Sequence, residues 1–269
     1  MRTIVHLSDL HFGRVDQALL QPLIEIVQSV SPHLVAISGD LTQRARAVQF
    51  RQARAFLDCL PAPQLVVPGN HDVPLYDVVA RFTRPLARYR RYIASDLEPS
   101  FVDGEIAAFG VNTARSLTFK SGRINQAQID RLRERLCAQP DKITKVVVTH
   151  HPFDLPPSRH PALLVGRAGL ARPILAECGC DLLLAGHLHV GAAAEGSPRG
   201  GPACEPIVVQ AGSATSTRRR GESNSFNVID IESRRIAVRR YDWRPDAGIF
   251  ERIGSESFER LAGGWRRAG

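Results

Sequence analysis

The sequence has few aromatic residues and no long apolar run. Phe, Trp and Tyr make up 6% of its 269 residues, which is too sparse for a surface that stacks single-stranded bases. No run of about 18 apolar residues occurs, so a transmembrane helix is excluded. In the opening MRTIVHLSDLHF, His6 and Asp9 interrupt the stretch where a signal peptide would need its apolar core. We therefore expect no membrane insertion and no N-terminal export signal.

Cysteine and lysine are also scarce. Five cysteines, an odd number in a chain of this length, do not indicate a disulfide framework, and Cys178 with Cys180 offers too few ligands for zinc. We expect reduced thiols and a cytoplasmic protein. Lysine occurs only at positions 120, 142 and 145, so the net charge of +8 rests on arginine. Such a bias fits the coding habit of a genome as well as an anionic partner, and we expect no nucleic-acid partner.

Short apolar runs recur along the chain. They occupy residues 3–8, 34–38, 64–68, 145–149, 181–185 and 206–210. Nearly continuous runs of this length, closed by Gly, Asp, Asn or His, are typical of strands buried on both faces. Between them, apolar residues at helical spacing predict helices over residues 18–30, 48–60 and 125–138. Alternating strands and helices predict an α/β fold with largely parallel pairing.

The last part of the chain changes character, because the helical pattern stops after Gly186. Residues 206–213, 225–232 and 235–243 are typical of successive antiparallel strands. We expect them to form a second sheet packed on the first. The sequence predicts a single domain over residues 1–260 and a loosely held tail over residues 261–269.

Five of the apolar runs end in side chains that can bind metal. In chain order the runs end in SDLHFG, SGDLTQ, PGNHD, THHPF and AGHLHVG. In an extended chain, a two-residue spacing puts both side chains on one face, so we expect Asp9 beside His11 and His187 beside His189. Ligands of α/β sheets bind at the carboxyl ends of the strands. The five ends therefore deliver their polar side chains to one crevice.

The delivered set suits two metal ions. It comprises carboxylate, amide and imidazole groups and no thiolate: Asp9, His11, Asp40, Asn70, His150, His187 and His189. These are too many ligands for one site with an open position, and they suit two ions about 3.5–4 Å apart that share one carboxylate. Any one motif alone is weak, since a lone histidine is more often a helix cap or a core residue. The interpretation as a two-metal site rests on five such motifs in order, each at a strand end.

The same blocks resemble the calcineurin-like metallophosphoesterase superfamily. Its pattern stands here as Asp9-Leu10-His11, Gly39-Asp40, Gly69-Asn70-His71-Asp72, His150 and Gly186-His187-Leu188-His189. The resemblance implies an α/β four-layer sandwich, two mixed sheets flanked by helices. The SDLHFG opening and the THHP block are most similar to the class III cyclic nucleotide phosphodiesterase branch.

The resemblance also implies roles for the ligands. Asp9, His11 and His189 would hold the first metal, Asn70, His150 and His187 would hold the second, and Asp40 would bridge them. His150 is preferred to His151 because the family pattern places one residue between the ligand and Pro152. The metals implied are iron, manganese or zinc, among which the ligand set does not choose.

The activity implied is hydrolysis of a phosphodiester, such as 3′,5′-cyclic AMP, by a monomer or homodimer. The alternative is a broader phosphomonoesterase or phosphodiesterase acting on lipid head groups or nucleic-acid ends. His71 follows a ligand without being one, and we expect it to meet the phosphoryl oxygen or to protonate the leaving group. Asp72 either orients that imidazole or caps the following helix, and we favour the cap.

Four further features have two interpretations each. His6 lies inside a strand, and we expect a core residue. Arg159 and His160 lie in the loop that follows His150, where specificity segments are common. Arg218 begins a run of three arginines that either attracts an anionic substrate or forms a solvated turn. The basic stretch 81–93 either binds an acidic surface or is an exposed helix face, and we favour the exposed face.

Overall fold

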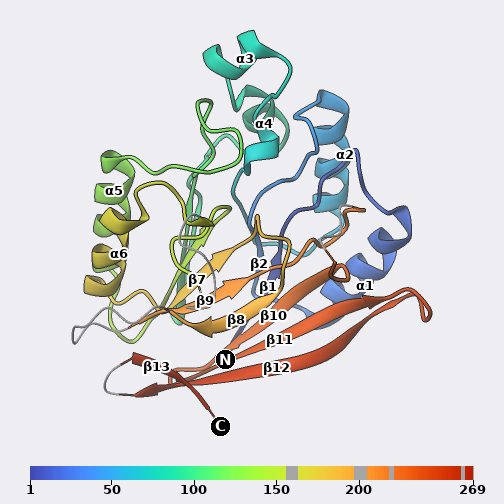
Figure 1. The fold of residues 1–269 in the computed structure, drawn as a ribbon. Helices are drawn as coiled ribbons and strands as arrows, with labels where there is room; N and C mark the ends of the chain where they lie inside the picture. Colours follow the sequence, from blue (N-terminus) through green and yellow to red (C-terminus); the bar gives the residue numbers. More distant parts are fainter. Residues whose placement is uncertain (156–162, 197–204, 218–220, 262–263, 269) are drawn as a thin grey trace.

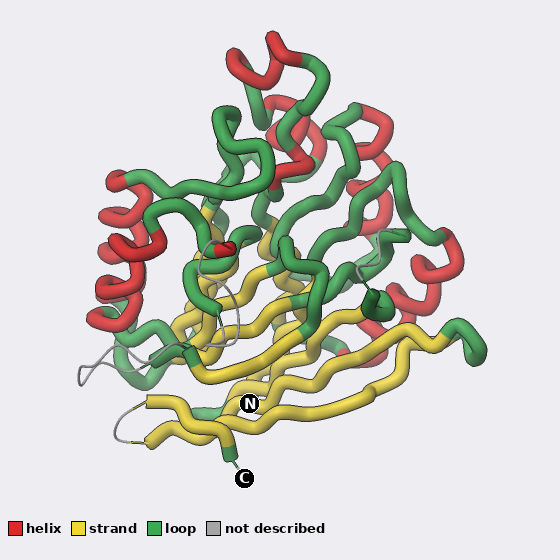
Figure 2. Tube along the Cα trace, viewed as in Figure 1, coloured by secondary structure: helices red, strands yellow, loops and turns green. Residues whose placement is uncertain are grey.

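The computed structural model describes residues 1–155, 163–196, 205–217, 221–261 and 264–268, and two mixed β-sheets lie face to face at its centre (Figure 1, Figure 2). The seven-stranded sheet has the order β13 (Gly264–Arg267), β12 (Ile249–Leu261), β11 (Arg235–Arg244), β10 (Ser225–Ile231), β1 (Arg2–Leu7), β2 (Leu34–Ile37) and β3 (Gln64–Val66). The six-stranded sheet has the order β4 (Ser100–Val102), β5 (Ile106–Val111), β6 (Thr144–Thr149), β7 (Leu182–Ala185), β9 (Ile207–Gln210) and β8 (Ala192–Glu195).

Helices cover the outer face of each sheet (Figure 1). On the seven-stranded sheet lie the turn η1 (Gln17–Leu19), α1 (Leu20–Val30) and α2 (Ala47–Asp58), and on the six-stranded sheet lie α5 (Gln126–Cys137) and α6 (Ala168–Glu177). The turn η2 (Asn70–Asp72) and the short helices α3 (Val78–Thr83) and α4 (Ala87–Tyr92) follow β3. None of the described helices combines the length and the apolar composition needed to cross a membrane.

Side chains that alternate along the strands build this four-layer sandwich. In β1, Ile4 joins the apolar core between the two sheets, whereas Val5 and Leu7 join the core under α1 and α2. A third core lies between the six-stranded sheet and helices α5 and α6. A strand with apolar side chains on both faces needs a covering layer on each side. The predicted fold class is confirmed.

The last strands pair differently from the expectation. They do not form a sheet of their own, because β9 pairs parallel to β7 and β10 pairs antiparallel to β1, with Ile4 opposite Ile229. Both β1 and β7 are buried on both faces, so their edges need partners from elsewhere in the chain. The sheets are therefore assembled from segments far apart in sequence.

Two expectations about thiols and the tail were wrong. The ends of α5 and α6 lie side by side and bring Cys137 and Cys178 into a disulfide, so reduced thiols no longer support a cytoplasmic location. Residues Gly264–Arg267 form β13 on the edge of β12 rather than a loose tail. The reason is Trp265, which is buried and donates its indole N–H to Asp181 Oδ1 at 2.8 Å.

Candidate metal centre

At five of the seven predicted ligands the backbone is left-handed rather than extended. Five residues beyond strand ends have positive φ: Asp9 (54°), His11 (51°), Asp40 (53°), His187 (71°) and His189 (57°). A non-glycine residue in this region costs on the order of 1 kcal/mol or more, and such strain concentrates at functional sites. The premise that a two-residue spacing acts through extended chain was therefore wrong. Asp9 and His11 still converge, whereas His187 and His189 enter different groups.

The first group consists of Asp9, His11 and His189. Asp9 Oδ1 lies 3.4 Å from His11 Nε2 and 3.4 Å from His189 Nε2, and the two imidazole rings are stacked at 5.2 Å. Asp9 Oδ1 and His11 Nε2 are buried without a hydrogen bond of good geometry to any described group. Two atoms that bind the same metal ion are about 3 Å apart. The spacing of Asp9 Oδ1 and His11 Nε2, and their lack of such a hydrogen bond, therefore fit a bound cation.

The second group consists of Asn70, His150 and His187. His150 donates from Nδ1 to the carbonyl of Ser38 at 2.7 Å, which leaves Nε2 facing Asn70 Oδ1 at 3.2 Å. Asn70 Nδ2 donates to the carbonyl of Phe119 at 3.4 Å, and so its oxygen is turned inward. The rings of His150 and His187 are 5.2 Å apart. Backbone carbonyls thus fix which atoms of these side chains face a metal.

Asp40 joins the two groups. Its Oδ2 lies 3.7 Å from His11 Nε2 in the first group and 3.3 Å from His150 Nε2 in the second. Its Oδ1 accepts the backbone N–H of His71 at 2.8 Å. One carboxylate oxygen therefore faces both sets of ligand atoms.

Two glycines allow the strand ends to approach the carboxylates of the centre closely. A Cβ on Gly69 would lie 2.1 Å from Asp40 Oδ1, and a Cβ on Gly186 would lie 1.8 Å from Ser8 Oγ and 2.7 Å from Asp9 Oδ2. Any larger residue would have to displace a group of the centre. The glycines that precede Asn70 and His187 are thus part of its construction.

His151 lies beside the centre but is held away from it. Its Nδ1 is 2.8 Å from Thr113 Oγ1 and its Nε2 donates to the carbonyl of Lys120 at 3.0 Å. Burial and the neighbouring His150 hold the pKa of His151 well below its usual value. Both ring nitrogens are in use, which favours His150 as the ligand.

The buried charges of the centre depend on each other. Burial alone would raise the pKa of Asp40, but His150 holds it well below its usual value. Burial alone would lower the pKa of His150, but Asp40 raises it to about 9. For His187, burial and the neighbouring His150 outweigh the attraction of Asp40 and Asp9 and lower its pKa to about 4. A buried carboxylate is stabilised here by opposite charge, which a bound cation would also provide.

His71 and Asp72 have separate surroundings. His71 Nδ1 donates to the carbonyl of Gln43 at 2.9 Å, which fixes the orientation of the ring. Its ring packs edge-on against His11 at 4.9 Å. Asp72 does not cap the following helix, where Asp77 is the N-cap. The preference for a cap was therefore wrong.

Asp72 instead fixes two loops of the centre. Its carboxylate accepts the backbone N–H groups of Leu41, Thr42 and Gly69 at 3.2, 2.9 and 2.9 Å. Burial and the nearby Asp40 raise the pKa of Asp72 to about 6. The residue after His71 therefore ties the end of β2 to the end of β3.

One supporting residue, Arg81, has little signature in the sequence. It falls in the basic stretch expected to be exposed, but its side chain is buried. It donates to the carbonyls of Pro74, Ser116 and Thr118 at 2.8, 2.8 and 3.2 Å, and its guanidinium lies 4.2 Å from the Phe119 ring. Arg81 thus holds the loop whose carbonyls orient Asn70 and His151.

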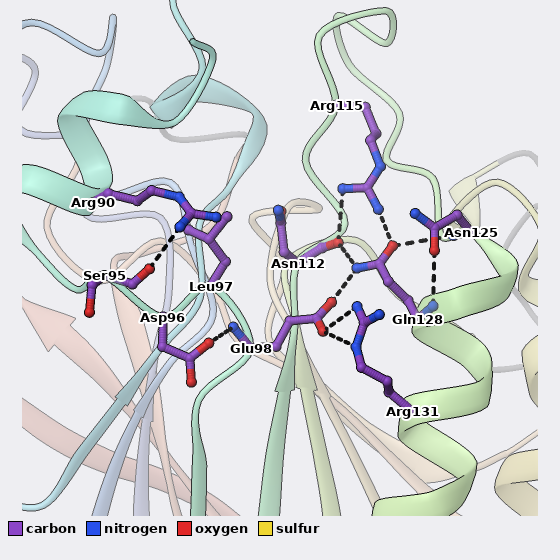
Figure 3. Close-up of a pocket in the computed structure, with 10 residues that line it drawn as sticks. All are labelled: Arg90, Ser95, Asp96, Leu97, Glu98, Asn112, Arg115, Asn125, Gln128 and Arg131. Atoms are coloured by element: carbon purple, nitrogen blue, oxygen red, sulfur yellow. Dashed lines mark hydrogen bonds and ion pairs between the residues drawn. The ribbon is translucent and has the colours of Figure 1, made fainter.

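A pocket of about 330 Å³ lies apart from this centre (Figure 3). It lies between α4 and α5, and none of the predicted ligands lines it. A hydrogen-bonded network lines it, in which Arg131 donates to Glu98 at 2.8 Å and Gln128 contacts both Glu98 and Arg115. The network joins helix α5 to the segment before β4.

Three expected substrate contacts are not tested by the structure. Arg159, His160 and Arg218 lie outside the described residues. His6 is a core residue as expected, since it is fully buried and its Nε2 is 2.9 Å from Ser38 Oγ. Burial lowers the pKa of His6 to about 3.

Comparisons with known proteins identify the family of this chain. A family model described as calcineurin-like phosphoesterase matches residues 2–191. The 3′,5′-cyclic adenosine monophosphate phosphodiesterase CpdA of Escherichia coli K12 is 24% identical over 200 residues, which cover 69% of this chain and 69% of that protein. The glycerophosphodiester phosphodiesterase GpdQ of Enterobacter lignolyticus is 25% identical over 172 residues, which cover 56% of this chain and 58% of that protein.

Solved structures share the fold. A dimetal phosphatase from Danio rerio aligns with a TM-score of 0.67 at 14% identity, over 95% of this chain and 98% of that one. The purple acid phosphatase PPD1 from Lupinus luteus aligns with a TM-score of 0.67 at 12% identity, over 95% of this chain and 53% of that one. Since the family model covers well over half of the sequence, the chain belongs to the calcineurin-like phosphoesterase family and is a metal-dependent hydrolase of phosphoric esters.

Proposed function

We propose that this enzyme hydrolyses a phosphodiester bond, with a cyclic nucleotide such as 3′,5′-cyclic AMP as its substrate. The observation that carries the proposal is Asp40 Oδ2, which lies 3.7 Å from His11 Nε2 and 3.3 Å from His150 Nε2. A carboxylate shared between two ligand groups is the arrangement that a two-metal site requires. The similarity to CpdA supports the choice of a cyclic nucleotide.

In this proposal the two groups hold two metal ions. Asp9, His11 and His189 hold the first, Asn70, His150 and His187 hold the second, and Asp40 contributes to both. Iron or manganese, with zinc as the alternative, suit a set of carboxylate, amide and imidazole ligands. Bound metals would neutralise phosphate charge and lower the pKa of an attacking water.

The chain's own residues orient the ester. His71 presents Nε2 because Nδ1 is occupied by the carbonyl of Gln43. This nitrogen meets a phosphoryl oxygen or, when protonated, gives its proton to the leaving oxygen. Arg44 lines one small cavity with Asn70, His71 and Phe119, and its positive charge favours an anionic ester at the adjoining centre.

A broader activity on lipid head groups or nucleic-acid ends is the second candidate. The similarity to GpdQ favours it. The two candidates differ in what the ester carries, not in the metal chemistry.

A substrate panel on metal-loaded enzyme separates the candidates. It comprises 3′,5′-cyclic AMP, 2′,3′-cyclic AMP, glycerophosphoethanolamine, single-stranded DNA, p-nitrophenyl phosphate and bis-p-nitrophenyl phosphate. We expect kcat/KM to be highest for 3′,5′-cyclic AMP. A value no higher than that for the generic aryl esters would remove the cyclic nucleotide and leave the broader activity.

A further inference from the structure

Six large apolar side chains are exposed together beside the centre. We name them the apolar rim: Tyr76, Val78, Val79, Phe82, Leu117 and Phe119. Each exposes between 53% and 82% of its surface. Scattered exposed apolar residues are normal, but a contiguous group of this kind marks an interaction site.

Arg81 holds the two parts of the apolar rim together. Arg81 points inward from α3 to the carbonyls of Ser116 and Thr118, which places that loop against the helix. The same helix carries Val78, Val79 and Phe82. The same guanidinium packs on the ring of Phe119 at 4.2 Å. The helix and the loop therefore form one surface.

A cationic groove adjoins this surface. The groove has a volume of about 370 Å³ and is lined by Val79 of the apolar rim and by Arg84, Arg88 and Arg91. Arg88 pairs with Asp77 at 3.0 Å. Arg84 and Arg91 form no ion pair with any group in the described part of the chain. Two positive charges are thus available next to exposed apolar side chains.

We propose that the apolar rim and this arginine groove dock the enzyme on an anionic phospholipid surface. Apolar side chains would enter the boundary between head groups and acyl chains, and the arginines would contact lipid phosphates. Helix α3 is the part of the molecule farthest from the sheets, and it protrudes (Figure 1). A protrusion with exposed aliphatic tips suits a flat, fluid surface.

Charge argues against other occupants. A second copy of this chain would place arginine against arginine, in a protein whose net charge is already +8. Three of the six rim side chains are aliphatic and offer no ring on which bases stack. Phosphate groups of an anionic lipid complement the free arginines, and the acyl boundary complements Val79 and Phe82.

Docking would bring the metal centre to the lipid surface. Phe119 belongs to the apolar rim and also lines the small cavity that contains Asn70 and His71. The entrance to the centre would therefore face the head groups. This surface is independent of the phosphodiester that is hydrolysed, because docking requires neither metal nor turnover.

Vesicle co-sedimentation of the full chain tests the proposal. The probes are vesicles of phosphatidylcholine alone and of phosphatidylcholine with about one-third phosphatidylglycerol, an anionic lipid. We expect binding to the anionic vesicles that weakens as salt is added, and little binding to phosphatidylcholine. Equal binding to both vesicles, or to neither, would overturn the proposal.

Matched variants locate the surface. Val79→Asp with Phe82→Asp should weaken binding at least about 10-fold, because two apolar side chains leave the interface. Arg84→Gln with Arg91→Gln should weaken binding roughly 5-fold for each charge removed. The control is Ile249→Asp with Ile253→Asp on β12, where the side chains are similarly exposed at 52% and 49%, and its binding should stay as in the wild type.

Two results would contradict the assignment. If the control pair loses binding to the same extent as the rim pair, the docking surface lies elsewhere. If sedimentation velocity shows a dimer that only the rim variant dissociates, the surface joins two copies. Turnover of bis-p-nitrophenyl phosphate within about two-fold of wild type shows that each variant is folded.

Discussion

The metal centre and the apolar rim are neighbours that are built in opposite ways. In the centre, Asp9, His11 and Asp40 are buried and lie just beyond strands of the sheets. In the rim, the side chains are exposed and lie on a six-residue helix and a loop. The centre depends on two packed sheets, whereas the rim depends on Arg81 and a few backbone carbonyls.

Rigidity is required in the centre but not in the rim. Ligands of a metal pair must stay within a few tenths of an ångström, which strand ends and buried hydrogen bonds provide. A surface that meets a large or fluid partner needs exposed side chains rather than fixed atoms. If the two regions are separate, a change in one should leave the other unaffected, except where Arg81 links them.

The largest effect is expected from Asp40→Asn, which changes the group common to both ligand sets. We expect turnover of bis-p-nitrophenyl phosphate to fall at least about 100-fold, since loss of even an outer partner of a metal site costs 10–100-fold. Metal content should fall as well, measured by mass spectrometry of the metals. Asp103→Asn is the control, because that carboxylate pairs with Arg2 away from the centre. Full metal content in Asp40→Asn would contradict the shared role.

A smaller effect is expected from Arg81→Gln, which tests the link between the regions. Loss of the guanidinium frees the loop whose Phe119 carbonyl orients Asn70. We expect metal affinity and kcat to fall about 10-fold, as for other outer partners of metal ligands. Arg81→Lys should have a metal affinity and a kcat between those of Arg81→Gln and the wild type. Arg84→Gln, which changes an exposed neighbour, should have the wild-type values. A lower melting temperature with unchanged metal affinity would make Arg81 merely structural.

The smallest effect on activity is expected from Cys137→Ala with Cys178→Ala, far from both regions. Removing this crosslink should lower the melting temperature by roughly 5–10 °C, from about 2–4 kcal/mol of stability, with turnover unchanged. Thiol titration of the denatured, unreduced wild type should find two fewer thiols than its five cysteines. Titration of all five would contradict the disulfide.

The centre could be predicted from the sequence because its signals are local. Each ligand follows directly on an apolar run, and the carboxyl ends of parallel strands share an edge. The strands β1, β2, β3, β6 and β7 therefore brought Asp9, Asp40, Asn70, His150 and His187 to one place without any knowledge of long-range pairing. The left-handed backbone at these residues was not foreseen, since periodicity describes only regular chain.

Features that depend on distant contacts were missed. The pairing of β10 with β1 joins segments more than 200 residues apart, and no local pattern specifies it. The same holds for the Cys137–Cys178 bridge and for the burial of Trp265. Arg81 was expected on an exposed face because its partners are backbone carbonyls, which carry no side-chain signature.

Metal content of His71→Ala beside that of His150→Ala tests the central claim most directly. The account predicts that His71→Ala keeps the wild-type metal content while kcat falls about 100-fold or more, as for loss of a proton donor. His150→Ala should lose metal as well as activity, because its Nε2 faces Asn70 and Asp40 at 3.2 and 3.3 Å. Loss of metal from His71→Ala would make His71 a ligand and contradict the division between metal binding and catalysis.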